Sequence, residues 1–153
     1  QTAHQALASI TELKLIDGIT PKIYEKLAPY VTALPAVNSS TLVNINTATA
    51  PVLMTLGAGM SKTEADNLIA YRQSINGFKN SEQVQQFAKT QKNLILPASD
   101  YTLVSNFFLV TAAAKQGEQF LQLNCLMQRQ ISKTQDNQLK IVVNSLWQSQ
   151  GTL

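Results

Sequence analysis

Apolar residues recur at helical spacing through the middle of the chain, and this pattern predicts three short helices in succession. Thr47 or Thr49 is placed to cap the first helix, and the Gly57-Ala58-Gly59 stretch ends it. Ser61 followed by Glu64 is a capping box that starts the second helix, because each side chain accepts a hydrogen bond from an otherwise unpaired backbone N–H. The apolar residues of these two helices share faces: Val52, Leu53, Leu56, Ala65, Leu68 and Ile69.

The turn between these helices is glycine-rich, so this part of the chain is predicted to be a helix-hairpin-helix. Asn76-Gly77 ends the second helix, and Asn80 or Ser81 caps a third. The core residues after that turn are Phe78, Val84 and Phe87. The hairpin itself reads Gly59-Met60-Ser61. In DNA-binding hairpins a second glycine follows the apolar residue, because a phosphate must approach the backbone closely. A serine in that place is better explained as a helix cap.

The start of the chain repeats this design. Ser9 and Glu12 form another capping box, and Thr20-Pro21 starts a helix after a glycine turn. This hairpin reads Gly18-Ile19-Thr20, again with a hydroxyl-bearing residue in place of the second glycine. The apolar residues of the block are Leu13, Ile16, Ile23, Tyr24 and Leu27. Because a repeat array needs more copies, the duplication predicts a compact helical subdomain over residues 1–92.

The pattern changes to an alternation with a period of two in residues 93–153. The runs 107–114 and 120–130 flank Lys115-Gln116-Gly117-Glu118, a connection that suits a β-hairpin. In the second run the apolar residues Leu121, Leu123, Cys125 and Met127 alternate with the amides of residues 122, 124, 128 and 130, which is typical of a half-buried strand. A third run places these residues on one face: Leu139, Ile141, Val143, Ser145 and Trp147.

These three runs predict an antiparallel β-meander, so the fold class is α+β with the helical subdomain first. The apolar face of the meander needs a cover, because three strands alone are marginally stable. We expect an upstream segment or a partner to provide it.

Composition limits what this chain does. With 153 residues and 44% apolar composition, it is long enough to bury a core as one domain or two small ones. The formal net charge is +3, but the twelve Lys and Arg are scattered, so no basic patch for nucleic acid is predicted. A single cysteine excludes an intrachain disulfide and a cysteine-rich metal site. No apolar run in these residues reaches the roughly 20 needed to span a bilayer.

Few residues are candidates for catalysis or for ligand binding. His4 is expected to be solvated near a terminus, and Cys125 to be a small buried hydrophobe, so no Cys-His or Ser-His-Asp pairing is predicted. Glu64 and Asp66 point to different helix faces and do not form an acid–base pair. Arg72 either binds a phosphate or a partner's carboxylate, or makes a structural ion pair or hydrogen bonds to loop carbonyls, and the structural role is favoured.

Several stretches together carry a resemblance that runs from about Leu7 to Trp147. They are Asn44-Ile45-Asn46-Thr47-Ala48, the hairpin Gly59-Met60-Ser61, Arg72, the step Phe78-Lys79-Asn80-Ser81, the earlier hairpin Gly18-Ile19-Thr20, and the strand FFLVTAAA. Two hairpins followed by a strand meander resemble the type II secretion minor pseudopilin K family, also called general secretion pathway protein K.

This resemblance implies a pilin-like fold, in which a sheet packs on an N-terminal helix and a SAM-like helical domain is inserted. It implies a non-catalytic subunit at the tip of a periplasmic pseudopilus, assembled with minor pseudopilins I and J and in contact with secreted substrate proteins. Such proteins are anchored in the inner membrane of Gram-negative bacteria by an N-terminal helix, which this sequence lacks. Some family members bind calcium, but Asp100, Glu118 and Asp136 are too isolated in sequence to define its ligands.

The alternative is a DNA-binding helix-hairpin-helix module of the competence type, because such proteins carry a stretch similar to residues 44–61. DNA binding asks for phosphate-approachable glycines and a basic stripe, and it gives no reason for the C-terminal meander. We therefore expect no nucleic acid partner.

Overall fold

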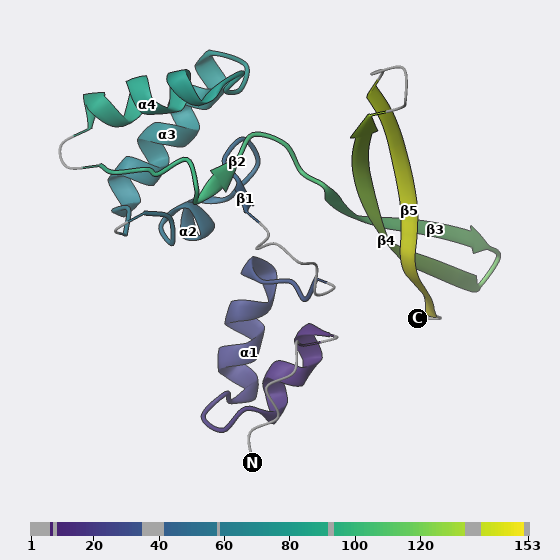
Figure 1. Ribbon diagram of the computed structural model, residues 1–153. Coiled ribbons are helices and arrows are strands. Elements are labelled where there is room, and N and C mark those ends of the chain that lie inside the picture. Colours follow the sequence, from purple (N-terminus) through teal and green to yellow (C-terminus); the bar gives the residue numbers. More distant parts are fainter. Residues whose placement is uncertain are drawn as a thin grey trace. The chain divides into compact units, whose positions relative to one another are not determined.

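The computed structural model describes residues 7, 9–34, 42–57, 59–91, 94–133 and 139–151, and for its last two strands the side chains of residues 119–132 and 140–146. The chain divides into two compact units, Gln1–Leu103 and Val104–Leu153. The first holds the helices and a short strand pair, and the second an antiparallel three-stranded sheet (Figure 1). The predicted α+β class is confirmed.

The division between the units falls later in the chain than the predicted boundary between residues 92 and 93. Leu96 and Tyr101 lie beyond that boundary, yet they are buried in the core of the helical unit. The segment after the last helix therefore belongs to the helical unit, although its sequence shows no helical pattern.

The first hairpin consists of the 3₁₀ helix η1 (Ile10–Leu15), helix α1 (Pro21–Leu27) and the 3₁₀ turn η2 (Ala28–Tyr30). Ser9 and Glu12 form the predicted capping box at η1, where a full α-helix does not develop. No described side chain of residues 9–34 is fully buried. Leu13 is half-buried and Ile16 is exposed, so the apolar face predicted for this block is not buried.

The centre of the helical unit is formed by β1 (Val43–Asn44), α2 (Ala50–Leu53), α3 (Lys62–Ser74), α4 (Ser81–Thr90) and β2 (Tyr101–Thr102). β1 and β2 pair in parallel, with Val43 opposite Tyr101. Thr49 occupies the N-cap position of α2, but its side chain makes no capping hydrogen bond, and Thr47 lies in the turn before it. The predicted threonine cap is therefore wrong in its chemistry, whereas Asn80 caps α4 as predicted by accepting from the N–H of Gln83.

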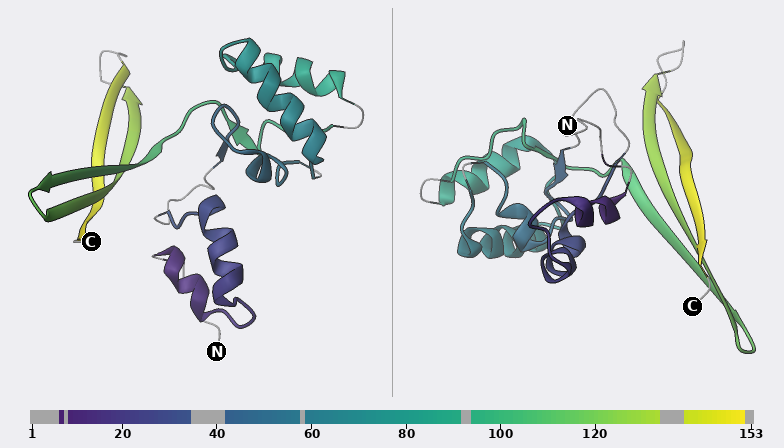
Figure 2. Two further views of the ribbon diagram at one scale, coloured as in Figure 1. Left: turned by 180° about the vertical axis from the view of Figure 1, so that it is seen from behind. Right: turned by 90° about the horizontal axis from the view of Figure 1, so that it is seen from below.

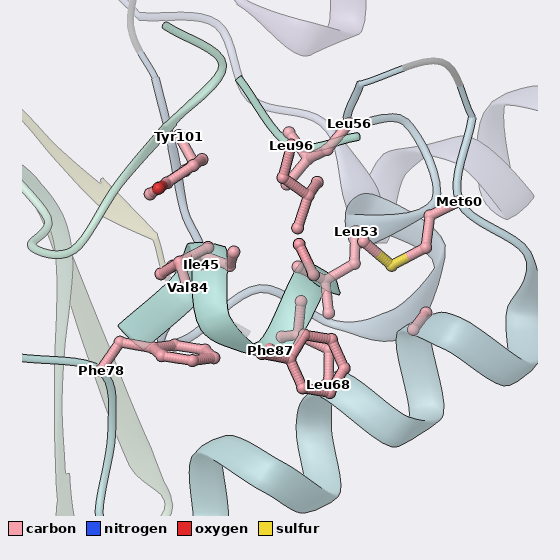
Figure 3. Packing of buried hydrophobic residues seen from close by; sticks show 12 residues of the cluster. Ile45, Leu53, Leu56, Met60, Leu68, Phe78, Val84, Phe87, Leu96 and Tyr101 are labelled. Atoms are coloured by element: carbon pink, nitrogen blue, oxygen red, sulfur yellow. The ribbon is translucent and has the colours of Figure 1, made fainter. Parts of the chain in front are cut away.

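The core of this unit gathers side chains from α2, α3, α4 and the segments that carry β1 and β2 (Figure 3). Its most deeply buried large residues are Ile45, Leu53, Leu68, Leu96 and Val84. Tyr71 stacks obliquely against Phe78 and Phe87, with ring centroids 5.9 and 5.2 Å apart. Apart from Val52, which is half-buried, the apolar positions predicted for the three central helices thus meet in one core, which the residues after α4 complete.

The second unit is a meander of β3 (Phe107–Gln116), β4 (Gln119–Lys133) and β5 (Leu139–Gly151), with β4 in the middle (Figures 1 and 2). Gly117, at φ 61°, and Glu118 form the two-residue turn between β3 and β4, so the predicted hairpin is confirmed with a tighter connection. The β4–β5 register shifts between Leu126, which pairs with Trp147, and Met127, which pairs with Ser145. This bulge interrupts the alternation, so Trp147 does not continue the predicted face of Ile141 and Val143.

Candidate functional site

The hairpin Gly59-Met60-Ser61 is closed by its own helix. Met60 is buried in the core, and Gly59 has φ 95° with open space where a side chain would begin. The N–H of Ser61 donates to Glu64 Oε2 at 2.8 Å, and the N–H of Glu64 donates to Ser61 Oγ at 3.3 Å. Hydrogen bonds from the Ser61 side chain and backbone lower the pKa of Glu64 below its usual 4.5.

A carboxylate therefore lies where a DNA-binding hairpin would hold a phosphate. The helix N-terminus favours an anion, and Glu64 already supplies one. Next to it, Lys62 pairs with Asp66 at 2.7 Å, so that cation is also engaged. This arrangement is a self-capped helix start, as predicted.

The hairpin Gly18-Ile19-Thr20 is also followed by a helix that its last residue caps. Gly18 adopts φ 86°, and the N–H groups of Ile19 and Thr20 donate to the carbonyls of Ile16 and Gly18. Thr20 Oγ1 accepts from the N–H of Ile23 at 3.3 Å. Both hairpins are thus closed turns, and their role in assembly stays a prediction.

Arg72 holds the loop that leads into α2. Its Nη1 donates to the carbonyl oxygens of Ile45 and Ala48, at 2.7 and 2.8 Å. Burial lowers the pKa of Arg72, but a guanidinium stays protonated in proteins, so this side chain remains cationic. Of the two structural roles foreseen, the structure shows hydrogen bonds to loop carbonyls, and no ion pair of Arg72 occurs among the described residues.

Asn46 is a structural centre that the sequence pattern did not single out. Its Nδ2 donates to the carbonyls of Phe78 and Leu103, and its Oδ1 accepts from the N–H of Phe78 at 2.8 Å. One side chain therefore joins three separate parts of the chain. The available signal was the Asn44-Ile45-Asn46 stretch, in which Asn44 Oδ1 accepts from the N–H of Asn46 in a local turn.

The segment after α4 also contacts the turn between α2 and α3. Asp100 Oδ2 accepts from the N–H of Gly57 at 3.2 Å. At Gly57, which has φ 60°, an added Cβ would lie 2.2 Å from the carbonyl oxygen of Ile95. This glycine is required by both its backbone conformation and its neighbour.

One face of the sheet is apolar and solvent-exposed, and we name it the apolar sheet face. The antiparallel register places its members on the same side of the three strands. Its exposed large residues are Phe108 (42%), Val110 (45%), Leu121 (46%), Ile131 (55%), Ile141 (63%) and Val143 (52%). Apart from Trp147, the described apolar residues predicted to share a face do so, but six large residues of that face are exposed, and the buried residue of β4 is Leu126 on the opposite side.

Cys125 lies on this apolar sheet face, where burial was the expectation. The structure leaves it half-buried, with its Sγ 3.2 Å from Ser145 Oγ. The prediction is wrong because, within the second unit, the described residues form the sheet and its connections and supply no layer over this side of it.

Among the described side chains of the apolar sheet face, the one that carries a charge is Arg129. Its Nη2 donates to the carbonyl of Ser105 at 2.7 Å, and its guanidinium lies 5.8 Å from the ring centre of Phe108. Its Nε is buried and has no hydrogen-bond partner among the described residues.

The described residues contain no group of three His, Cys, Asp or Glu that would hold a metal ion. Asp100 is engaged with Gly57, and Glu118 lies in the β3–β4 turn, while His4 and Asp136 fall outside the described residues. The described side chains thus do not assemble a calcium site. Among the described helices, none combines the length and apolar character needed to cross a membrane.

Comparison with known proteins gives consistent matches. Two family models match this chain, both described as type II secretion system protein K, over residues 1–36 and 43–100. Together they cover more than half of the chain. Type II secretion system protein K of Pectobacterium carotovorum is 32% identical over 123 residues, or 77% of this chain and 37% of that protein. Its counterpart in Aeromonas hydrophila is 48% identical over 46 residues, or 30% of this chain and 13% of that protein.

Proposed function

Because this chain belongs to the type II secretion system protein K family, we propose that it is the periplasmic part of a minor pseudopilin without catalytic activity. It acts at the tip of the secretion pseudopilus, where it assembles with minor pseudopilins I and J and contacts secreted substrate proteins. The chain spans 37% and 13% of the two relatives from Pectobacterium and Aeromonas, so these roles belong to a longer protein.

The observation that carries this proposal is the apolar sheet face. Six large apolar side chains on one side of a three-stranded sheet are exposed. Contiguous apolar surface of this kind marks a site that another segment covers. In a pilin-like fold that cover is the N-terminal helix, which also anchors the protein in the inner membrane.

The helical unit supports a structural role. The polar groups at both hairpins and at Arg72 make hydrogen bonds within the unit. These bonds hold its turns and loops in place. Such a module presents a rigid surface for neighbours. Calcium remains a proposal that rests on the family, because the described side chains do not converge on a metal site.

The competence-type DNA-binding module is the weaker candidate. At the central hairpin a carboxylate, Glu64, holds the N–H of Ser61 and would repel a phosphate there. Binding to duplex DNA in the micromolar range, lost steeply between low and moderate salt, would favour this candidate over the secretion role.

A chimera tests the secretion role directly. Residues 1–153 replace the matching region of protein K from Pectobacterium carotovorum, and the chimera is expressed in a strain that lacks its own protein K. We expect exported enzymes to reach the medium again, and crosslinking to recover minor pseudopilins I and J. A chimera that is stable and anchored but restores neither secretion nor crosslinking contradicts the proposal. The matched control is the same strain with the region deleted.

A further inference from the structure

The size of the apolar sheet face fits one helix. Three strands spaced about 4.8 Å apart are about 10 Å across, and a helix with its side chains is about 10–12 Å wide. Along β4 the face runs from Leu121 to Ile131, which is about 34 Å at 3.4 Å per residue. A helix of about 20 residues has nearly that length. One helix therefore matches the width of the face and its length measured along β4.

Arg129 places a charged group under any segment that covers this face, so that segment has to supply hydrogen-bond acceptors. It lies between Met127 and Ile131 on the same side of β4, and its backbone pairs with Val143 of β5. Its Nη2 has an acceptor in the carbonyl of Ser105, whereas its Nε is buried without a hydrogen-bond partner among the described residues. A purely apolar helix laid over this point would remove water from a guanidinium without replacing its hydrogen bonds, which is strongly unfavourable.

The sheet itself offers no counter-charge nearby. Among the described residues of this unit, the one acidic side chain is that of Glu118. It lies in the β3–β4 turn, at the other end of the hairpin from Arg129. The carbonyl of Ser105 satisfies one donor only. An acceptor for the remaining donors has to come from the covering segment.

We infer that the helix covering the apolar sheet face carries a carboxylate that binds the guanidinium of Arg129. The helix is the N-terminal helix of the longer protein, so this inference rests on the proposed function. The ion pair fixes the helix along the sheet, because apolar contacts alone allow it to slide by a turn, whereas a forked guanidinium bonds a carboxylate in one place.

Two synthetic peptides test this inference on a chain of residues 1–153. Both are amphipathic helices of about 20 residues, with leucines on one face and serine and glutamine on the other, and they differ at one central position, Glu or Gln. We expect wild-type chain to bind the Glu peptide at least about tenfold tighter than the Gln peptide, measured by fluorescence anisotropy. A series that moves the Glu along the peptide should show the gain over about one helical turn only.

Variants of the chain assign the gain to one residue. In Arg129→Gln the two peptides should bind with nearly equal affinity, and in Arg129→Lys part of the preference should remain. Lys115→Gln, at the other end of the hairpin, removes the same charge and should keep the full preference. Should Arg129→Gln fail to fold by circular dichroism, the wild-type ratio and the position series decide alone.

The outcomes separate the pairing from the cover. Equal affinity of both peptides for wild-type chain, or a preference that Lys115→Gln removes equally well, overturns the Arg129 pairing and leaves a helix-binding face. If neither peptide binds, both the pairing and the helix-covered sheet of the proposed function are overturned.

Discussion

Replacing Asn46 by alanine should destabilise the helical unit strongly. The substitution removes three hydrogen bonds, at 3.0 Å to Phe78 O, 3.1 Å to Leu103 O and 2.8 Å from Phe78 N–H. Each contributes about 1 kcal/mol net, and each backbone partner left without a bond in a half-buried site adds to the loss. We expect the free energy of unfolding to fall by about 3 kcal/mol.

Urea unfolding followed by circular dichroism at 222 nm measures this change, because the helices lie in one unit and dominate that signal. The matched control is Asn67→Ala. Asn67 is an exposed asparagine in α3 whose Nδ2 donates to Gln91 Oε1 at 3.1 Å, so its loss should change the free energy by less than about 0.5 kcal/mol. Equal effects of the two substitutions would refute the idea that Asn46 holds three segments together.

Three further changes probe the same unit. Arg72→Met should lower the free energy of unfolding by about 3 kcal/mol, because two hydrogen bonds from a cation to carbonyls are lost; an effect no larger than that of Lys62→Met, at an exposed ion pair, would argue against it. Gly57→Ala should destabilise by at least about 2 kcal/mol and Gly59→Ala by about 1 kcal/mol, since both have positive φ but only Gly57 meets a carbonyl. Glu64→Gln should be less stable than wild type at pH 7. Because the folded pKa of Glu64 is depressed below 4.5, its contribution is complete above 4.5 and is lost as the pH falls through the folded value, so urea midpoints of the two proteins should converge in acid.

Local chemistry made much of the helical unit predictable. A capping box needs only two side chains three residues apart, so Ser9 with Glu12 and Ser61 with Glu64 were visible in the sequence and occur in the structure. The hairpin turn at Gly117 was equally local. The helical core was predicted through its periodic residues, such as Leu68 and Val84.

The remaining features depend on residues far apart in the chain. Asn46 bonds to residues 32 and 57 positions away, and the neighbouring Asn44 indicates only a local turn, not these distant partners. Leu96 and Tyr101 lie in a stretch without periodicity, so their burial follows from tertiary packing alone. The bulge before Trp147 shifts the register by one residue, which alternation cannot reveal.

The same limit applies to the apolar sheet face. Period-two alternation shows which residues share a side of β4, but it does not say what lies over them. Cys125 was therefore placed on the correct side and given the wrong degree of burial. The sequence does not mark Arg129, because a single arginine between two amide residues in a strand resembles an ordinary surface residue.

The parallel pairing of β1 with β2 brings the beginning and the end of residues 43–102 side by side (Figure 1). The two ends of this stretch are about 4.8 Å apart, which is the spacing of neighbouring strands. Such a stretch can be inserted into another polypeptide at one position. The block can therefore change in size without changing the distance between the segment that enters it and the segment that leaves it.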